Sequence, residues 1–361
     1  MRPLALLLCA CALLLPGAAR AAACSPLNCA PSQFTLAHGT MLAVRGDVDK
    51  PLRVIDLRTG KTAWRLPAGI VAGDVLLHAD GGLVTWFHAA RGTRLGDATL
   101  AAKGRFSLVG ASQDGSRAVL ARTQRRSTTF AIVSRTSQRT VKLGGNTWSF
   151  DALRGAKLFL IRTLRNGYQV RLYDLAANTL DPTPLKSPGE RATIQGIPFE
   201  RASSPNGRYL FTLYVDGNGG AMIHQLDLAR GRARCIDLPG GGDFNSALTW
   251  AIVPDPDGRT LWAVTAGYGR VVAVDVRAHR VRDTYAFPHA AWTANNGVAV
   301  LSPDGERIAY TDAEHIWFVE LAQRKVVPGP AHTTIALGYA PDESHLWVVG
   351  QRSRVSPLPP R

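Results

Sequence analysis

The chain has 361 residues, a formal net charge of +15 and an apolar fraction of 46%. These values exclude an intrinsically disordered chain, because the apolar residues suffice for a packed core and only 19% of residues are charged. The basic excess is mostly arginine scattered singly, which favours a coding bias over a nucleic-acid partner. The densest groups are Arg122, Arg125 and Arg126, and Arg230, Arg232 and Arg234.

The first predicted element is a cleaved signal peptide over residues 1–23. Arg2 precedes an apolar run over residues 4–15, and small residues follow it. A run of about twelve apolar residues is too short to span a bilayer, and the pattern is typical of a secretory signal. We expect cleavage after Ala21 or Ala23 and a secreted or periplasmic protein. No later segment is long and apolar enough to predict a transmembrane helix.

Three cysteines follow the predicted signal, namely Cys24, Cys29 and Cys235. In an oxidising compartment we expect a disulfide between Cys24 and Cys29, whereas Cys235 lies in an apolar strand pattern and is expected to be a buried free thiol. The alternative is a lipoprotein anchored at Cys24. Ala21 at the −3 position and Arg20 between the apolar run and the cysteine argue against that alternative.

Repeats occupy the mature chain, residues 24–361. The clearest unit begins with a strand over residues 298–301 and a Ser-Pro-Asp-Gly turn over residues 302–305. Three more strands follow, over residues 307–311, over residues 316–321 and from residue 325. The proline presets φ in the turn, the aspartate caps it, and the glycine accepts a positive φ. Related turns end at residues 39, 81, 115, 155, 207, 258, 305 and 343, at intervals of about 43 residues, the length of a four-stranded propeller blade.

A second marker is an acidic residue that ends the third strand of a repeat. It occurs at Asp56, Asp174, Asp227, Asp275 and Glu320. Such an acid accepts backbone N–H bonds in the turn that follows, so we expect a structural role and not a catalytic one.

These patterns predict an all-β fold, a β-propeller of seven or eight four-stranded blades, as a single domain over residues 24–361. Two irregular stretches, residues 181–193 and 240–246, are predicted to be loops at one face of the disc. The ring is expected to close by bringing residues 333–358 against residues 34–67. Because the proline-rich tail supplies at most one short edge strand, we expect the N-terminal side to complete the last blade.

The stretch Ser302-Pro303-Asp304-Gly305-Glu306-Arg307-Ile308-Ala309-Tyr310 and the stretch Asp56-Leu57-Arg58-Thr59-Gly60 resemble the repeats of bacterial WD40-like and YVTN-type β-propellers, including the TolB-like repeat. The resemblance covers the mature chain and is strongest over residues 200–350. It implies the fold and says little about function, since such propellers serve as scaffolds, periplasmic partners and, less often, enzymes. The chain departs from true WD40 repeats, because no Trp-Asp dipeptide ends a third strand, and it has no recognisable TolB N-terminal domain.

No motif assigns catalytic, cofactor-binding or metal-binding residues. The nine histidines are isolated, and no nucleophile-elbow sequence is present. We interpret the stretch Asp216–Gly220 as a hairpin loop and not as a calcium site, and we interpret Gly267–Gly269 as a hairpin turn. Trp250 and Trp292 are the aromatic candidates for lining a ligand face.

We therefore expect a monomeric, non-enzymatic binding scaffold that takes a protein or an envelope glycan or polymer on one face of the disc, with no cofactor. The alternative is a propeller enzyme, lactonase- or lyase-like, with a metal held at the axis. A third class is electrostatic attachment to an anionic envelope polymer through arginine.

Overall fold

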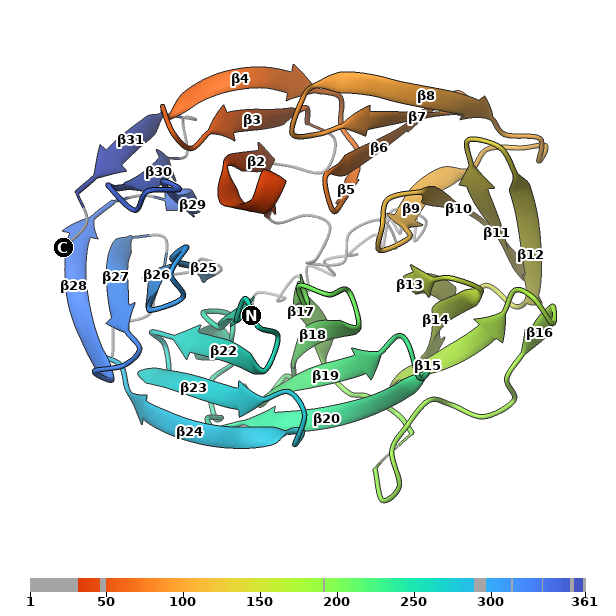
Figure 1. Cartoon of the computed structure of the whole chain (residues 1–361). Helices are drawn as coiled ribbons and strands as arrows, with labels where there is room; N and C mark the ends of the chain where they lie inside the picture. Colours follow the sequence, from red (N-terminus) through yellow and green to blue (C-terminus); the bar gives the residue numbers. More distant parts are fainter. Residues whose placement is uncertain are drawn as a thin grey trace, which may run out of the picture.

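A computed structural model describes residues 32–45, 50–190, 192–288, 297–312, 314–332, 334–350 and 354–359. The predicted signal peptide, Cys24, Cys29 and Trp292 lie outside the described residues. Within them the chain forms eight antiparallel sheets arranged as the blades of a ring (Figure 1). The predicted all-β propeller is confirmed, and the number of blades is eight.

Each blade is a simple meander in which neighbouring strands in sequence pair in the sheet. The strands of blades 1 to 4 are β1 (Ser32–Leu36), β2 (Met41–Arg45), β3 (Leu52–Asp56), β4 (Lys61–Leu66); β5 (Ile70–Ala72), β6 (Val75–Asp80), β7 (Leu83–His88), β8 (Thr93–Thr99); β9 (Ser107–Ala111), β10 (Arg117–Gln124), β11 (Ser127–Ser134), β12 (Gln138–Gly144); and β13 (Trp148–Arg154), β14 (Lys157–Leu164), β15 (Gly167–Asp174), β16 (Thr179–Leu180). A 3-10 turn, η1 (Ala37–Gly39), joins β1 to β2.

The second half of the ring repeats this plan. Its strands are β17 (Ile197–Ser203), β18 (Tyr209–Val215), β19 (Ala221–Asp227), β20 (Arg232–Leu238); β21 (Ala251–Pro254), β22 (Thr260–Thr265), β23 (Arg270–Asp275), β24 (Arg280–Ala286); β25 (Val298–Leu301), β26 (Arg307–Thr311), β27 (His315–Glu320), β28 (Lys325–Ala331); and β29 (Thr334–Tyr339), β30 (Leu346–Gly350), β31 (Val355–Leu358). One short helix, α2 (Phe244–Ala247), lies between blades 5 and 6.

The turn chemistry expected from the sequence is present. Ser302 Oγ donates to Asp304 Oδ1 and accepts the N–H of Arg307, and Gly305 N donates to Ser302 O with φ at +78°. In blade 8 the corresponding residue, Glu343, itself takes a positive φ of +57°. The prediction is wrong in blade 2, where Asp80–Gly81 joins the second and third strands, and the first hairpin turns earlier, at Gly73 between β5 and β6.

The acids at the ends of the third strands mostly act as predicted. Asp56, Asp174, Asp227 and Asp275 each accept at least one backbone N–H from the next turn. Glu320 instead accepts a bond from Arg307 Nε at 2.7 Å, since its longer side chain reaches the neighbouring strand.

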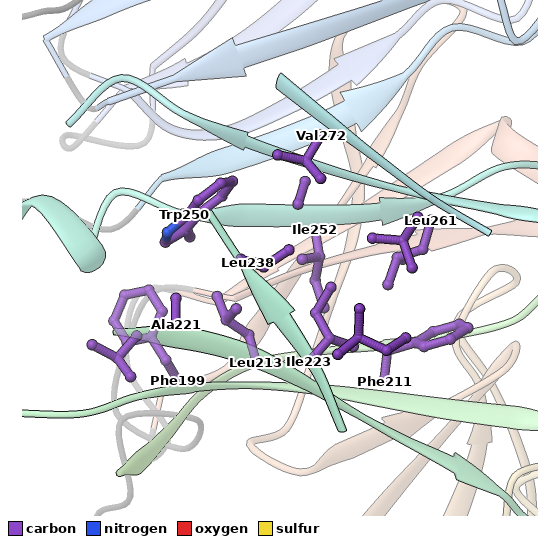
Figure 2. Close-up of a cluster of buried hydrophobic side chains, with 14 of the residues drawn as sticks. Phe199, Phe211, Leu213, Ala221, Ile223, Leu238, Trp250, Ile252, Leu261 and Val272 are labelled. Carbon is purple, nitrogen blue, oxygen red and sulfur yellow. The ribbon is translucent and has the colours of Figure 1, made fainter. Parts of the chain in front are cut away.

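The core consists of apolar clusters between successive blades. Eight such clusters occur among the described residues, one at each blade interface of the ring. Figure 2 shows the largest, in which Phe211 and Leu213 of blade 5 face Ile252 and Leu261 of blade 6, with Trp250 at one end. Burial of such side chains between sheets is the main stabilising term for this architecture.

The ring closes by face-to-face packing of blade 8 on blade 1. The cluster at this interface includes Leu42 and Ile55 from blade 1 and Ala336 and Trp347 from blade 8. The expected short strand in the tail is confirmed as β31. The expected completion of the last blade from the N-terminal side is not seen in the described residues, because β1 pairs with β2 in blade 1 and the described part of blade 8 has three strands.

Candidate functional site

The two faces of the disc differ in the connections they carry. In an antiparallel meander the turns between strands 1 and 2 and between strands 3 and 4 emerge on one face, which we call the turn face. The turns between strands 2 and 3, and the connections between blades, emerge on the other, which we call the loop face. The predicted loops 181–193 and 240–246 are both connections between blades. Residues 240–246 follow β20 on the loop face, whereas 181–193 runs along outer strands, where Leu185 N donates to Val170 O and Ser187 Oγ donates to Ala233 O.

The turn face has short turns, and some of its arginines form ion pairs with acids of the same blade. Arg58 contacts Asp56, Arg208 contacts Asp227, and each guanidinium lies 2.8 Å from its carboxylate. These contacts hold the pKa of each aspartate carboxyl below its usual range, opposed in Asp227 by burial. The turn face therefore presents ion pairs together with exposed arginines, such as Arg230 and Arg232, that form no ion pair among the described residues.

The loop face over blades 3 and 4 is strongly basic. Four segments, residues 100–106, 122–127, 144–148 and 162–168, contain no Asp or Glu. We call their seven cationic residues the basic strip: Lys103, Arg105, Arg122, Arg125, Arg126, Arg162 and Arg165. Among the described residues, no ion pair joins any of the seven to an acidic side chain.

Hydrogen bonds join these segments into one surface. Arg122 Nη1 donates to Lys103 O at 2.5 Å, and Gly145 N donates to Arg126 O at 2.9 Å. Thr163 N donates to Thr147 O at 2.8 Å, which links the hairpin of blade 4 to the connection that precedes it. Because hydrogen bonds tie each of the four segments to the next, the cations of the basic strip lie on one continuous surface.

Two strip arginines lie over aromatic rings. The guanidinium of Arg122 is 5.1 Å from the ring centroid of Phe106, and that of Arg162 is 5.6 Å from that of Trp148. Cation–π contacts of this kind orient the side chains and leave the outward N–H groups for another partner.

A hollow adjoins the strip. It has a volume of about 380 Å³ and lies between the β14–β15 hairpin and the end of the connection to blade 5. Its lining is Thr163, Leu164, Arg165, Asn166, Gly167, Tyr168, Gln195 and Gly196. Tyr168 and Ile194 exchange both backbone hydrogen bonds at 2.8 Å, so the two sides of the hollow are fixed to each other.

The loop face over blades 5 to 7 has the opposite character. It carries Asp216, Asp243, Asp312 and Glu314 in its turns and connections. Asp216 Oδ1 accepts the N–H groups of Asn218 and Gly220, which confirms the hairpin-loop interpretation of this stretch. The charge of the loop face is therefore divided, with the cations concentrated over blades 3 and 4.

Two charged groups lie at the inner strands of blades 4 and 5. Asp151 is the extra residue of a bulge in β13, and its Oδ1 accepts a bond from Arg201 Nη2 at 2.5 Å. Glu200, beside Arg201 on β17, is half-buried, and its Oε2 accepts the N–H of Ile252. Burial raises the pKa of Glu200 to about 8, although the bond from Ile252 opposes the shift, so this carboxyl is mainly protonated at neutral pH.

The structure places the residues singled out from the sequence unevenly. Arg122, Arg125 and Arg126 belong to the basic strip, whereas Arg230 and Arg232 lie on the turn face. Trp250 is fully buried in the core of Figure 2 and lines no ligand face, which corrects the sequence interpretation. Cys235 is free but half-buried, less covered than expected, because it lies on the outermost strand β20.

Sequence analysis missed Arg162, Arg165, Tyr168 and the raised pKa of Glu200. The sequence contains a pattern that indicates the strip, namely four segments without Asp or Glu in two successive repeats. Only the geometry of the blades brings these segments together. Among the described residues no cluster of three or more His, Cys, Asp or Glu side chains has the geometry of a metal site. No described helix has the length and hydropathy needed to cross a bilayer.

Comparisons with known proteins support the fold. No family model and no curated protein matches the chain. Among solved structures it is similar to apo AztD from Citrobacter koseri, with 13% identity over 82% of this chain and 84% of that chain and a TM-score of 0.55. It is similar to the Dos1 propeller, with 9% identity over 90% of each chain and a TM-score of 0.53.

A third likeness is to the dihydro-heme d1 dehydrogenase NirN in complex with DHE, with 13% identity over 93% of this chain and 77% of that chain and a TM-score of 0.52. At such identities these likenesses show the fold alone. The protein is an all-β, eight-bladed β-propeller. The narrower YVTN-type and TolB-like resemblance stays a sequence prediction.

Proposed function

We propose that the protein is an exported, non-enzymatic binding scaffold that captures an anionic partner on the loop face. The observation that carries the proposal is the basic strip, in which seven cations lie together without an acidic partner among the described residues. Like charges held close together repel, and an anionic partner relieves this repulsion while releasing counterions.

The difference between the two faces supports the proposal. The turn face carries acids in most of its turns, and arginines such as Arg58 and Arg208 are bound to acids of their own blade, so an anionic partner there would meet like charges. On the strip, the outward N–H groups of Arg125 and Arg126 are exposed to solvent. A rigid ring with a charged face also limits the entropy lost on binding.

The test compares two pairs of charge reversals that change the net charge equally. One variant is Arg125→Glu/Arg126→Glu on the strip, and its matched control is Arg230→Glu/Arg232→Glu on the turn face, where both side chains are exposed. The probe is inorganic polyphosphate, and binding is measured by isothermal titration calorimetry over a range of salt concentrations.

We expect the strip variant to bind polyphosphate at least about tenfold more weakly than the wild type, and its dependence of log affinity on log salt to fall by about two units of slope. The control should stay close to the wild type. Equal losses in both variants, or no polyphosphate binding by the wild type, would contradict the proposal.

The enzyme alternative has its own measurement. A propeller enzyme with an axial metal should purify with a stoichiometric divalent ion, which elemental analysis of the purified protein detects. A stoichiometric ion together with an unaffected strip variant would favour that class.

A further inference from the structure

The hollow beside the basic strip combines three kinds of group. Tyr168 lines it with a half-buried aromatic side chain whose ring packs toward Tyr214 of the core, 6.3 Å between ring centroids, while Asn166 and Gln195 offer side-chain amides and Arg165 offers a cation. Asn166, Gln195 and Arg165 are exposed. The hollow, of about 380 Å³, is open to solvent, so it suits one residue of a surface-bound chain better than an enclosed small molecule.

This set of groups fits a sugar ring that carries an anionic substituent. One face of a pyranose is a plane of C–H groups that packs on an aromatic ring, and its edge is a row of hydroxyls that exchange hydrogen bonds with amides. Arg165 is placed to bind a carboxylate or phosphate on the same ring through paired N–H bonds. The hollow alone holds only a small ligand, whereas the adjoining strip continues the anionic contacts.

We propose that the partner of the loop face is an acidic polysaccharide, with one sugar ring in the hollow and further anionic groups of the polymer along the basic strip. This inference rests on the proposed function and specifies its ligand class. The hollow contributes selectivity for a sugar, and the strip contributes affinity for the charge of the chain.

The shape of the hollow is fixed before binding. Gly167 has φ at +138°, and a Cβ there would overlap the carbonyl oxygen of Ile194. Gly196 has φ at +92°, and a Cβ there would overlap the carbonyl oxygen of Val215 at 2.6 Å. Glycine at position 167 lets the two walls approach, and glycine at position 196 lets the second wall pack on β18; a preformed site loses less entropy on binding.

Two other polyanions fit the surface less well. Single-stranded nucleic acid binds through a series of exposed aromatic rings, but the rings of Phe106 and Trp148 are already covered by strip arginines. A membrane surface calls for a cluster of exposed apolar anchors, whereas the three large exposed apolar side chains of the described residues, Leu83, Leu95 and Val109, lie on three different strands, β7, β8 and β9.

The test uses three probes on the full-length mature protein: galacturonate oligomers, maltose oligomers of the same length, and inorganic polyphosphate. The hollow variants are Tyr168→Ala and Asn166→Ala/Gln195→Ala, and Tyr168→Phe retains the ring. Because Asn166 and Gln195 are exposed, the double variant should keep the fold even if Tyr168→Ala does not. Circular dichroism and melting temperature check each variant.

We expect the wild type to bind galacturonate oligomers, to bind maltose oligomers at least about tenfold more weakly, and to lose about tenfold in galacturonate affinity in Tyr168→Ala and in the double variant. Tyr168→Phe should stay near the wild type, and polyphosphate binding should be unchanged in all hollow variants.

The outcomes separate the two proposals. If polyphosphate binds through the strip but galacturonate binding does not respond to the hollow variants, the polysaccharide inference is wrong and the proposed function stands. If single-stranded DNA or anionic lipid vesicles bind more tightly than galacturonate, the ligand class is wrong. If no polyanion binds, both proposals fail.

Discussion

Trp347, in the last blade, donates its indole N–H to the carbonyl oxygen of Leu57 in the first blade at 2.5 Å. The indole ring also packs on Gly60, whose φ is +66° and where a Cβ would overlap the ring. The same device joins blades 1 and 2, where Trp64 Nε1 donates to Ala89 O at 2.8 Å. The closing interface is therefore built like an internal interface of the ring.

Replacing Trp347 should measure the strength of the closure. We expect Trp347→Ala to lower the free energy of unfolding by about 3–5 kcal/mol, since it removes a large buried ring. Trp347→Phe should lose about 1–2 kcal/mol, because the donor is lost while Leu57 O stays partly covered. Urea unfolding followed by circular dichroism gives both values, and Trp64→Phe serves as the control for an internal interface. A loss below about 0.5 kcal/mol in Trp347→Ala would show that the closure contributes little.

Deleting residues 334–361 should abolish cooperative folding. The deletion removes β29 to β31 and exposes the apolar flank of blade 1 around Leu42 and Ile55. An open ring also exposes the flank of blade 7 around Phe318 and is prone to aggregation. Calorimetry and light scattering test this expectation. A truncated protein that stays monomeric and melts in one sharp transition near the parent temperature would refute the closed-ring interpretation.

The raised pKa of Glu200 predicts how stability depends on pH. The pKa of this carboxyl is about 8 in the folded protein because of burial, whereas its ordinary value is 4.5. The folded state therefore binds this proton more tightly than the unfolded state. The resulting contribution to the free energy of unfolding is fully present below about pH 4.5 and is lost as the pH rises through 8. The loss is at most about 1.4 kcal/mol per pH unit.

The Glu200→Gln variant separates this residue from other titrating groups. The amide keeps an acceptor for the N–H of Ile252 but does not ionise. We expect the variant to lose less stability than the wild type between pH 5 and pH 9 in denaturant titrations. Parallel pH profiles for the two proteins would mean that Glu200 ionises normally in the folded state.

The cysteines give a chemical prediction. Burial raises the pKa of the Cys235 thiol to about 12, assisted by the charges of Glu190 and Asp237, so very little thiolate is present at pH 8. We expect iodoacetamide to modify Cys235 slowly in the native protein and quickly in denaturant. If the predicted Cys24–Cys29 disulfide forms, the unfolded mature protein takes up one alkyl group before reduction and three after it. Mass spectrometry counts them, and three before reduction would exclude the bridge.

The sequence by itself determined the local structure of the blades. Proline, aspartate and glycine in turns such as Ser302–Gly305 act through φ preferences and hydrogen bonds within a few residues, so they are readable without the fold. The acid at the end of a third strand, such as Asp227, likewise accepts hydrogen bonds from residues two and three positions later in the chain. The sequence left seven and eight blades open, because the way the first and last repeats meet depends on packing between segments far apart in the chain, and the structure has eight sheets.

Only the tertiary structure decided the candidate site. Lys103, Arg126 and Arg165 come from three separate segments, and the meander of two blades brings them to one face. Likewise Glu200 owes its raised pKa to burial against the next blade, which no pattern within its own strand records. The interaction energy of a charge and the pKa of a titratable group depend on the groups and solvent that surround them. In a ring of blades, packing between segments far apart in the sequence determines those surroundings.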